Sequence, residues 1–117
     1  MSRQLGTAAE QRAKNYLLAQ GLKWIGSNYR CRWGEIDLIM SEGSCLIFVE
    51  VRSRSSLSFG GAAASIGWAK KQKLLKAASH YLLVHPNHSK QPSRFDVLSL
   101  DGSETINWIR NAFGLDF

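Results

Sequence analysis

Residues 35–52 read EIDLIMSEGSCLIFVEVR and carry the strongest structural signal in the chain. Two runs rich in apolar and β-branched residues, 35–40 and 45–52, flank a polar stretch over residues 41–44 that contains Gly43. This pattern predicts two strands joined by a turn. Because both faces of the predicted pair carry large apolar side chains, we expect the hairpin to lie in the interior of its sheet.

A symmetric hairpin about Gly43 would place Asp37 opposite Phe48 and Glu35 opposite Glu50. Side chains alternate across a sheet, so one face of this hairpin would be purely apolar and would belong to the core. That face carries Ile36, Leu38, Met40, Cys45, Ile47, Val49 and Val51. The other face would bring three carboxylates together with Arg52.

Asp37 and Glu50 would be diagonal neighbours on that second face, with Cβ atoms about 7 Å apart. Two carboxylates at this separation can bind one Mg²⁺ or Mn²⁺, which takes one or two carboxylates together with waters and phosphate oxygens. Arg52 would lie beside them and could hold a phosphate. The alternative is a solvated sheet face on which Arg52 forms weak salt bridges with Glu50 or Glu35.

The rest of the chain predicts an α-β-β-β-α-β order followed by a short last element. We expect helices from residue 7 to about 20 and from 65 or 66 to 84, strands at 22–29 and 94–100, and a strand or helix at 106–113. Turns or loops are expected at 30–34, 53–61, 86–93 and 101–102. Thr7 and Glu10 form a capping box at the start of the first helix, although Glu10 could also lean toward a metal site.

Length and charge limit the classes of protein to be considered. A chain of 117 residues predicts one domain, residues 1–117, and no apolar run is long enough to span a membrane. No secretory signal is visible, and Cys31 and Cys45 lack zinc-ligand spacing, so we expect a reduced, cytoplasmic protein. The net charge of +6 favours an anionic partner, such as nucleic acid, an acidic protein or a membrane surface, although basic charge can also serve solubility alone.

Five basic residues are the candidates for contact with nucleic acid. They are Arg30, Arg32, Arg54, Lys70 and Lys73. Trp33 and Trp68 occur among them, and a mixture of cationic and aromatic side chains is typical of nucleic-acid surfaces. The alternative is a solvated helix face, with the tryptophans in the core.

Several motifs together resemble those of the YraN-like family, also called uncharacterised protein family 0102. They are GEIDLI at 34–39, FVEVRSR at 48–54, GGAAAS at 60–65, Lys70 with KLL at 73–75, and RFDV at 94–97. The resemblance covers about residues 5–113. It implies a bacterial protein with an α/β, restriction-endonuclease-like core, in which helices flank a mixed central β-sheet, similar to the archaeal Holliday-junction resolvases.

The resemblance also implies site residues. The nuclease pattern of this fold has an acid, then an acid-x-lysine on the next strand, often with a helix glutamate. Asp37 and Glu50 match the two acids, Arg52 stands at the lysine position, and Glu10 matches the helix glutamate. Glu35 belongs to the Gly-Glu-Ile-Asp motif of the family.

The expected function is metal-dependent hydrolysis of DNA, with branched or junction DNA among the candidate substrates and a homodimer expected by analogy with the resolvases. Arg52 puts this activity in question, because an arginine cannot lose its proton to help activate water as a lysine can. The alternatives are a non-catalytic nucleic-acid-binding module that retains the fold and a protein–protein adaptor.

Overall fold

Five strands form one sheet with the order β1-β2-β3-β4-β5 in the part of the chain that the structure, a computed structural model, describes: residues 2–53, 66–100 and 105–113. The strands are β1 (Lys23–Cys31), β2 (Gly34–Glu42), β3 (Cys45–Ser53), β4 (Ser93–Leu100) and β5 (Ile106–Phe113). The helices are α1 (Ser2–Ala19), α2 (Trp68–Val84) and α3 (Pro86–Ser89). Only the β3–β4 pair is parallel among the described pairs, so the sheet is mixed.

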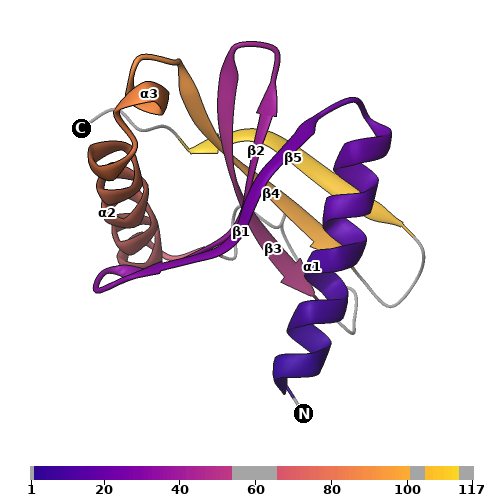
Figure 1. The fold of residues 1–117 in the computed structure, drawn as a ribbon. Helices are drawn as coiled ribbons and strands as arrows, with labels where there is room; N and C mark the ends of the chain where they lie inside the picture. Colours follow the sequence, from indigo (N-terminus) through magenta and orange to yellow (C-terminus); the bar gives the residue numbers. More distant parts are fainter. Residues whose placement is uncertain (1, 54–65, 101–104, 114–117) are drawn as a thin grey trace.

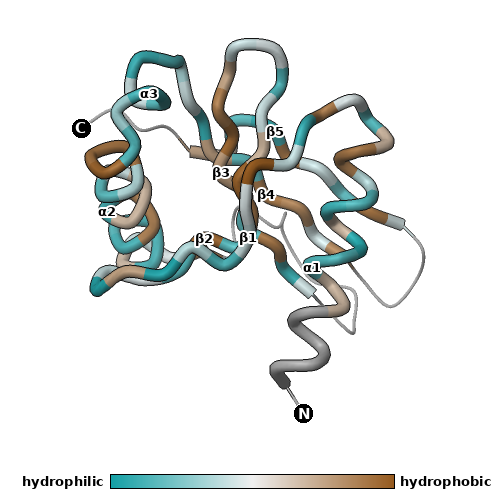
Figure 2. The backbone as a smooth tube through the Cα atoms, in the orientation of Figure 1, coloured by the Kyte–Doolittle hydropathy of each residue, from teal (hydrophilic) through white to brown (hydrophobic). Residues whose placement is uncertain are grey.

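The sheet lies between α1 and α2, and each helix covers one core cluster (Figure 1). The cluster beneath α2 includes Phe48, Phe95 and Tyr81, whereas the cluster beneath α1 includes Leu17 and Ile47. Hydrophobic positions gather in the central strands and hydrophilic positions at the hairpin turns (Figure 2). This architecture confirms the predicted α/β fold with a mixed sheet flanked by helices, and β2 and β3 occupy interior positions as expected.

The first helix begins earlier than the sequence predicted. Because α1 starts at Ser2, Thr7 lies inside the helix, and the predicted capping box with Glu10 is wrong. The predicted end at Gly21 is confirmed. Gly21 has a φ of +98°, and the Leu22 N–H donates to the carbonyl of Leu17 at 3.1 Å, as in a Schellman motif.

The turn between β2 and β3 is shorter than predicted, and this changes the register. The strands extend to Glu42 and resume at Cys45, so the turn contains only Gly43 and Ser44. Gly43 has a φ of +60°, which a glycine adopts without strain. The observed pairs, such as Leu38 opposite Val49, differ from the predicted pairs by two residues.

The predicted apolar face holds except at one end. Leu38, Met40, Ile47 and Val49 pack beneath α1, with Cys45 and Val51 at the edge of the same cluster. Ile36 instead lies in the cluster beneath α2. The described pairs between β2 and β3 end at Leu38. The residues of β2 before Leu38, including Ile36, pair with β1 instead, so the alternation of side chains predicted from pairing with β3 does not extend to Ile36.

The remaining segments follow the prediction with local differences. The second helix starts at Trp68 rather than at 65 or 66, α3 lies within the predicted loop at 86–93, and the last element is a strand. The predicted turn at 30–34 contracts to Arg32 and Trp33. Residues 54–61 of one predicted loop and the predicted turn at 101–102 lie outside the described residues. No helix in the described ranges is long and apolar enough to cross a membrane.

Candidate active site

Asp37 and Glu50 face one another across the β2–β3 pair. Their side chains share a hydrogen bond just beyond the last β2–β3 pair, Leu38 with Val49. This register differs by two residues from the predicted one, so the predicted pairings of Asp37 with Phe48 and of Glu35 with Glu50 are wrong. The Val51 N–H donates to Asp37 Oδ2 at 2.8 Å, which holds the Asp37 side chain against β3. The side chain of Glu50 is only 4% exposed. Glu50 is therefore buried, whereas Asp37 beside it keeps partial contact with solvent.

The electrostatics of this pair favour a neutral Asp37. Its pKa is raised from 3.8 to about 8, first by burial and then by the charge of Glu50. The charge of Glu10 and a hydrogen bond with Glu50 also raise this pKa, and the hydrogen bond from the Val51 N–H acts in the opposite direction. At neutral pH the folded protein thus keeps a proton on Asp37 unless positive charge is added at the site.

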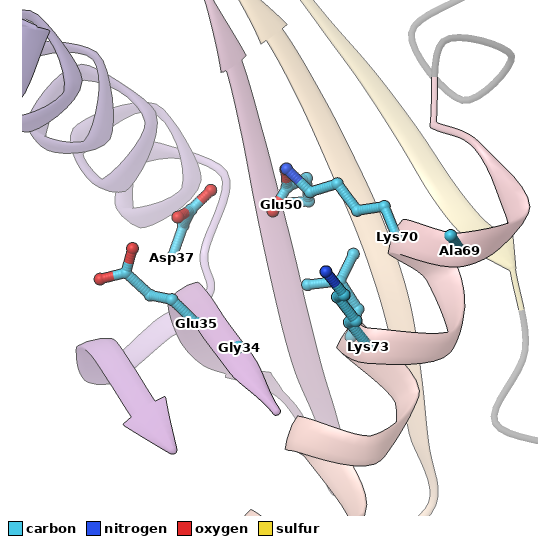
Figure 3. A pocket seen from close by; sticks show the side chains of 8 residues that line it. Gly34, Glu35, Asp37, Glu50, Ala69, Lys70 and Lys73 are labelled. Atoms are coloured by element: carbon cyan, nitrogen blue, oxygen red, sulfur yellow. The ribbon is translucent and has the colours of Figure 1, made fainter. Parts of the chain in front are cut away.

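A pocket of about 470 Å³ opens onto the two acids. One wall comes from the start of β2 and the other from the first turns of α2, as Figure 3 shows. Its lining consists of Gly34, Glu35, Asp37, Glu50, Ala69, Lys70, Lys73 and Leu74. Asp37, Glu50 and Glu35, which the sequence predicted on one face of the hairpin, thus line one pocket.

Cationic groups surround Glu50. Lys70 Nζ lies 2.8 Å from Glu50 Oε2, whereas Arg52 Nη1 lies 4.0 Å from the same oxygen. Lys73 lines the pocket one turn further along α2. Lys70, which the sequence assigned only to nucleic-acid contact, is thus the direct partner of the buried acid, and Arg52 is a more distant one.

Two further candidate acids have partners of their own. Glu35 Oε2 accepts a hydrogen bond from Arg30 Nε at 2.9 Å, so Arg30 shares its charge with an acid of the pocket. Glu10 projects from α1 and accepts a hydrogen bond from Asn28 Nδ2 at 2.8 Å. Glu10 therefore meets the sheet near Asp37, although its predicted capping role is wrong.

The other basic candidates lie in three places: at the tip of the β1–β2 hairpin, on α2, and outside the described residues. Arg32 lies at the tip of the β1–β2 hairpin, with its guanidinium carbon 4.8 Å from the centroid of the Trp33 ring. Lys73 and Lys70 lie on the neighbouring helix. Arg54 falls outside the described residues.

Comparison with known proteins identifies the family. The model of uncharacterised protein family UPF0102 matches residues 9–100. The chain belongs to this family. It is 56% identical to a UPF0102 protein of Legionella pneumophila over 97% of both chains. It is also 52% identical to one of Methylobacillus flagellatus over 95% of this chain and 97% of the relative, and 50% identical to one of Aeromonas hydrophila over 92% and 83%.

The site of this UPF0102 chain offers two carboxylates to a metal ion. Within residues 2–53, 66–100 and 105–113, no three Asp, Glu, His or Cys side chains are grouped so that they could hold a metal by themselves. Mg²⁺ nevertheless accepts sites with only one or two carboxylates, since waters and substrate phosphates fill the remaining positions. Asp37 and Glu50 fit that requirement, and a cation between them would offset the repulsion that raises the pKa of Asp37.

Sequence analysis missed a second charged centre of the UPF0102 fold on β4, around Asp96, which pairs with Val49, the residue before Glu50. Asp96 on β4 is fully buried and accepts hydrogen bonds from Arg94 Nε at 2.8 Å, Trp108 Nε1 at 2.9 Å and the Asn111 N–H at 2.9 Å. Arg94 also donates to Glu42 at 3.1 Å. With its oxygens occupied by donors of the protein itself, Asp96 joins β4 to β5. The RFDV motif contains two of these residues and was the available signal.

Proposed function

We propose that this protein hydrolyses phosphodiester bonds of DNA with the help of a divalent cation, Mg²⁺ or Mn²⁺, held by Asp37 and Glu50. The observation that carries this proposal is the contact of Asp37 with the buried Glu50 at a pocket that Lys70 and Lys73 also line. An acidic centre within a basic surround suits a cation beneath a phosphate backbone. The family membership supports the proposal only through the nuclease pattern that its motifs resemble.

The cation would replace the proton that Asp37 otherwise retains. With positive charge at the site, Asp37 and Glu50 can be ionised together, because the repulsion between them is offset. When bound, the cation supplies Lewis-acid polarisation of a phosphate oxygen. Lys70 Nζ already touches Glu50, so it would share that carboxylate with the cation or turn toward the phosphate.

The protein's own residues then have distinct roles. Hydrolysis adds water at phosphorus, one P–O ester bond breaks, and the proton given up by the water is balanced by the one gained by the leaving oxygen. Lys70 and Arg52 are placed to offset the charge that develops on the phosphate. Glu35 lines the pocket and is placed to orient water, although Arg30 binds its carboxylate, whereas Glu10 lies outside the lining and accepts a hydrogen bond from Asn28.

The test is cleavage of single-stranded, flap, junction and duplex DNA in Mg²⁺ or Mn²⁺. Wild-type protein should cleave at least one substrate, and Asp37→Asn and Glu50→Gln should each lower the rate by a factor of 10² or more, about 2.7 kcal/mol of barrier. Glu42→Gln is the matched control, because it removes the same charge from the same hairpin outside the pocket. Equal activity in wild type and both site variants would refute the proposal.

A second candidate is DNA binding without hydrolysis. The ion pair of Lys70 with Glu50 favours it, because it neutralises the acid without a metal. Arg52 in place of a lysine also favours it, because an arginine cannot lose its proton to help activate water. This function predicts salt-dependent DNA binding that a chelator does not change, with no cleavage of any substrate. A stoichiometric Mn²⁺ site that is lost in Asp37→Asn would count against it.

A further inference from the structure

The tip of the β1–β2 hairpin forms one edge of the pocket. Arg32 and Trp33 make the turn, and the next residue, Gly34, lines the pocket. The tip extends beside α2 (Figure 1), where Lys76 Nζ lies 5.0 Å from the centroid of the Trp33 ring. A Cβ on Gly34 would lie 3.8 Å from Lys73 Cβ. The indole therefore lies against α2, the helix that forms one wall of the pocket, and directly precedes the lining residue Gly34 in the chain.

Trp33 combines an exposed aromatic surface with two cations. The residue is 37% exposed, although its ring is large and apolar. Arg32 and Lys76 lie within about 5 Å of the ring centroid. Both cations lie over the ring, so a base that stacks there would displace one of them, which could then contact an adjoining phosphate.

The shape of the pocket separates single strands from duplexes. Glu50 is only 4% exposed, so a phosphate must enter between the hairpin and α2 to reach it. A volume of about 470 Å³ lies in the range of small-ligand sites. Duplex DNA is too stiff to bend one phosphate into a pocket of this size, whereas an unpaired strand can bend a single phosphate into the pocket and turn its base outward.

We propose that the ligand of this site is single-stranded DNA, including the unpaired strand of a branched molecule, with one phosphate in the pocket and a neighbouring base stacked on Trp33. The inference rests on the proposed function for the position of the phosphate, and it adds the substrate class. Lys70 and Lys73 would contact the strand at the pocket, and Arg32 and Lys76 would contact it at the rim.

The experiment measures binding of a short labelled oligonucleotide and of its blunt duplex by fluorescence anisotropy, in EDTA and at one fixed salt concentration. Wild type should bind the single strand more tightly than the duplex. Trp33→Leu should weaken single-strand binding about fivefold or more and leave duplex binding unchanged. Trp33→Phe, which keeps an aromatic ring, should retain part of the affinity and excludes a folding defect as the cause.

Trp24→Leu is the matched control. Trp24 is 46% exposed and has Lys14 Nζ 3.9 Å from its ring centroid, but it belongs to the α1 side of the sheet. This variant should bind both DNAs as wild type does. Unchanged single-strand affinity in Trp33→Leu, an equal or greater affinity for duplex, or equally tight binding of poly-glutamate would each overturn the inference. The last result would indicate an acidic protein partner.

Because EDTA prevents cleavage, this inference and the proposed function can fail separately. A protein that cleaves DNA but binds single strands without help from Trp33 refutes only the inference. A protein that binds single strands through Trp33 but cleaves no DNA with any divalent cation refutes only the proposed hydrolysis.

Discussion

Replacing Asp37 with asparagine should make the metal-free protein more stable, and increasingly so as pH rises. The pKa of Asp37 is raised from 3.8 to about 8 in the folded state by burial and by the charge of Glu50. Asparagine has nearly the same shape and can still accept the hydrogen bond from the Val51 N–H. The substitution therefore removes an ionisation that disfavours folding without leaving a cavity.

The pH range and the magnitude follow from this shift. Below pH 3.8 the Asp37 carboxyl is protonated in both the folded and the unfolded state, so its ionisation takes nothing from the stability of the protein. Between pH 3.8 and about 8 the unfolded chain releases the proton while the folded protein retains it, and stability is lost as pH rises. At 1.36 kcal/mol per pKa unit the full shift would correspond to about 6 kcal/mol. Partial contact of Asp37 with solvent reduces the expected loss between pH 5 and pH 9 to about 2–4 kcal/mol.

The assay is urea unfolding followed by tryptophan fluorescence, in EDTA, at pH 5, 7 and 9. The difference in free energy of unfolding between Asp37→Asn and wild type should grow with pH by about 2–4 kcal/mol. Glu42→Gln should behave oppositely, because Arg110 and Arg94 lower the pKa of Glu42. It should cost about 1 kcal/mol at pH 7 and at pH 9, where the carboxylate is ionised in both states, and the cost should fall only as the pH drops below the ordinary pKa of 4.5. An Asp37→Asn protein no more stable than wild type at pH 9 would refute this reasoning.

Three other substitutions test the structure around the site by the same unfolding assay. Asp96→Asn should destabilise the protein by about 3 kcal/mol, because it leaves the charge of Arg94 without its buried partner and places an amide donor next to other donors. A loss below about 1 kcal/mol would argue against a buried ion pair. Gly21→Ala should cost about 1 kcal/mol, since φ is +98° there, and an unchanged stability would exclude the left-handed helix end. Phe48→Ala should cost about 3–5 kcal/mol through the cavity it opens beneath α2, and a much smaller loss would mean that Phe48 is not a central core residue.

Local periodicity was enough to predict the two long helices, the first four strands and the side of β3 that carries Glu50. The alternation of apolar and charged residues in 45–52 places Glu50 on the side of β3 that faces α2, whatever the register. Register depends on the turn, and Ser41 and Glu42 have the polarity of turn residues although they belong to a strand. The φ of +60° at Gly43 allows the tighter connection, and composition alone does not distinguish a two-residue turn from a four-residue one.

Contacts between distant elements lay beyond sequence reasoning. Lys70 meets Glu50 only because the crossover from β3 to β4 sets the start of α2 over the pocket. Glu10 fits a capping pattern, yet its partner is Asn28, which is 18 residues away and has a φ of +54°. The resemblance to a nuclease pattern pointed to Glu10, although it did not indicate how this acid is held.

The most direct test of the proposed cation site is anomalous diffraction from crystals of the protein soaked in Mn²⁺. We predict a peak between Asp37 and Glu50, within about 2.0–2.6 Å of an oxygen of each carboxylate, and no peak in crystals of Asp37→Asn. An empty site at saturating Mn²⁺, with Lys70 Nζ still bound to Glu50, would contradict the account.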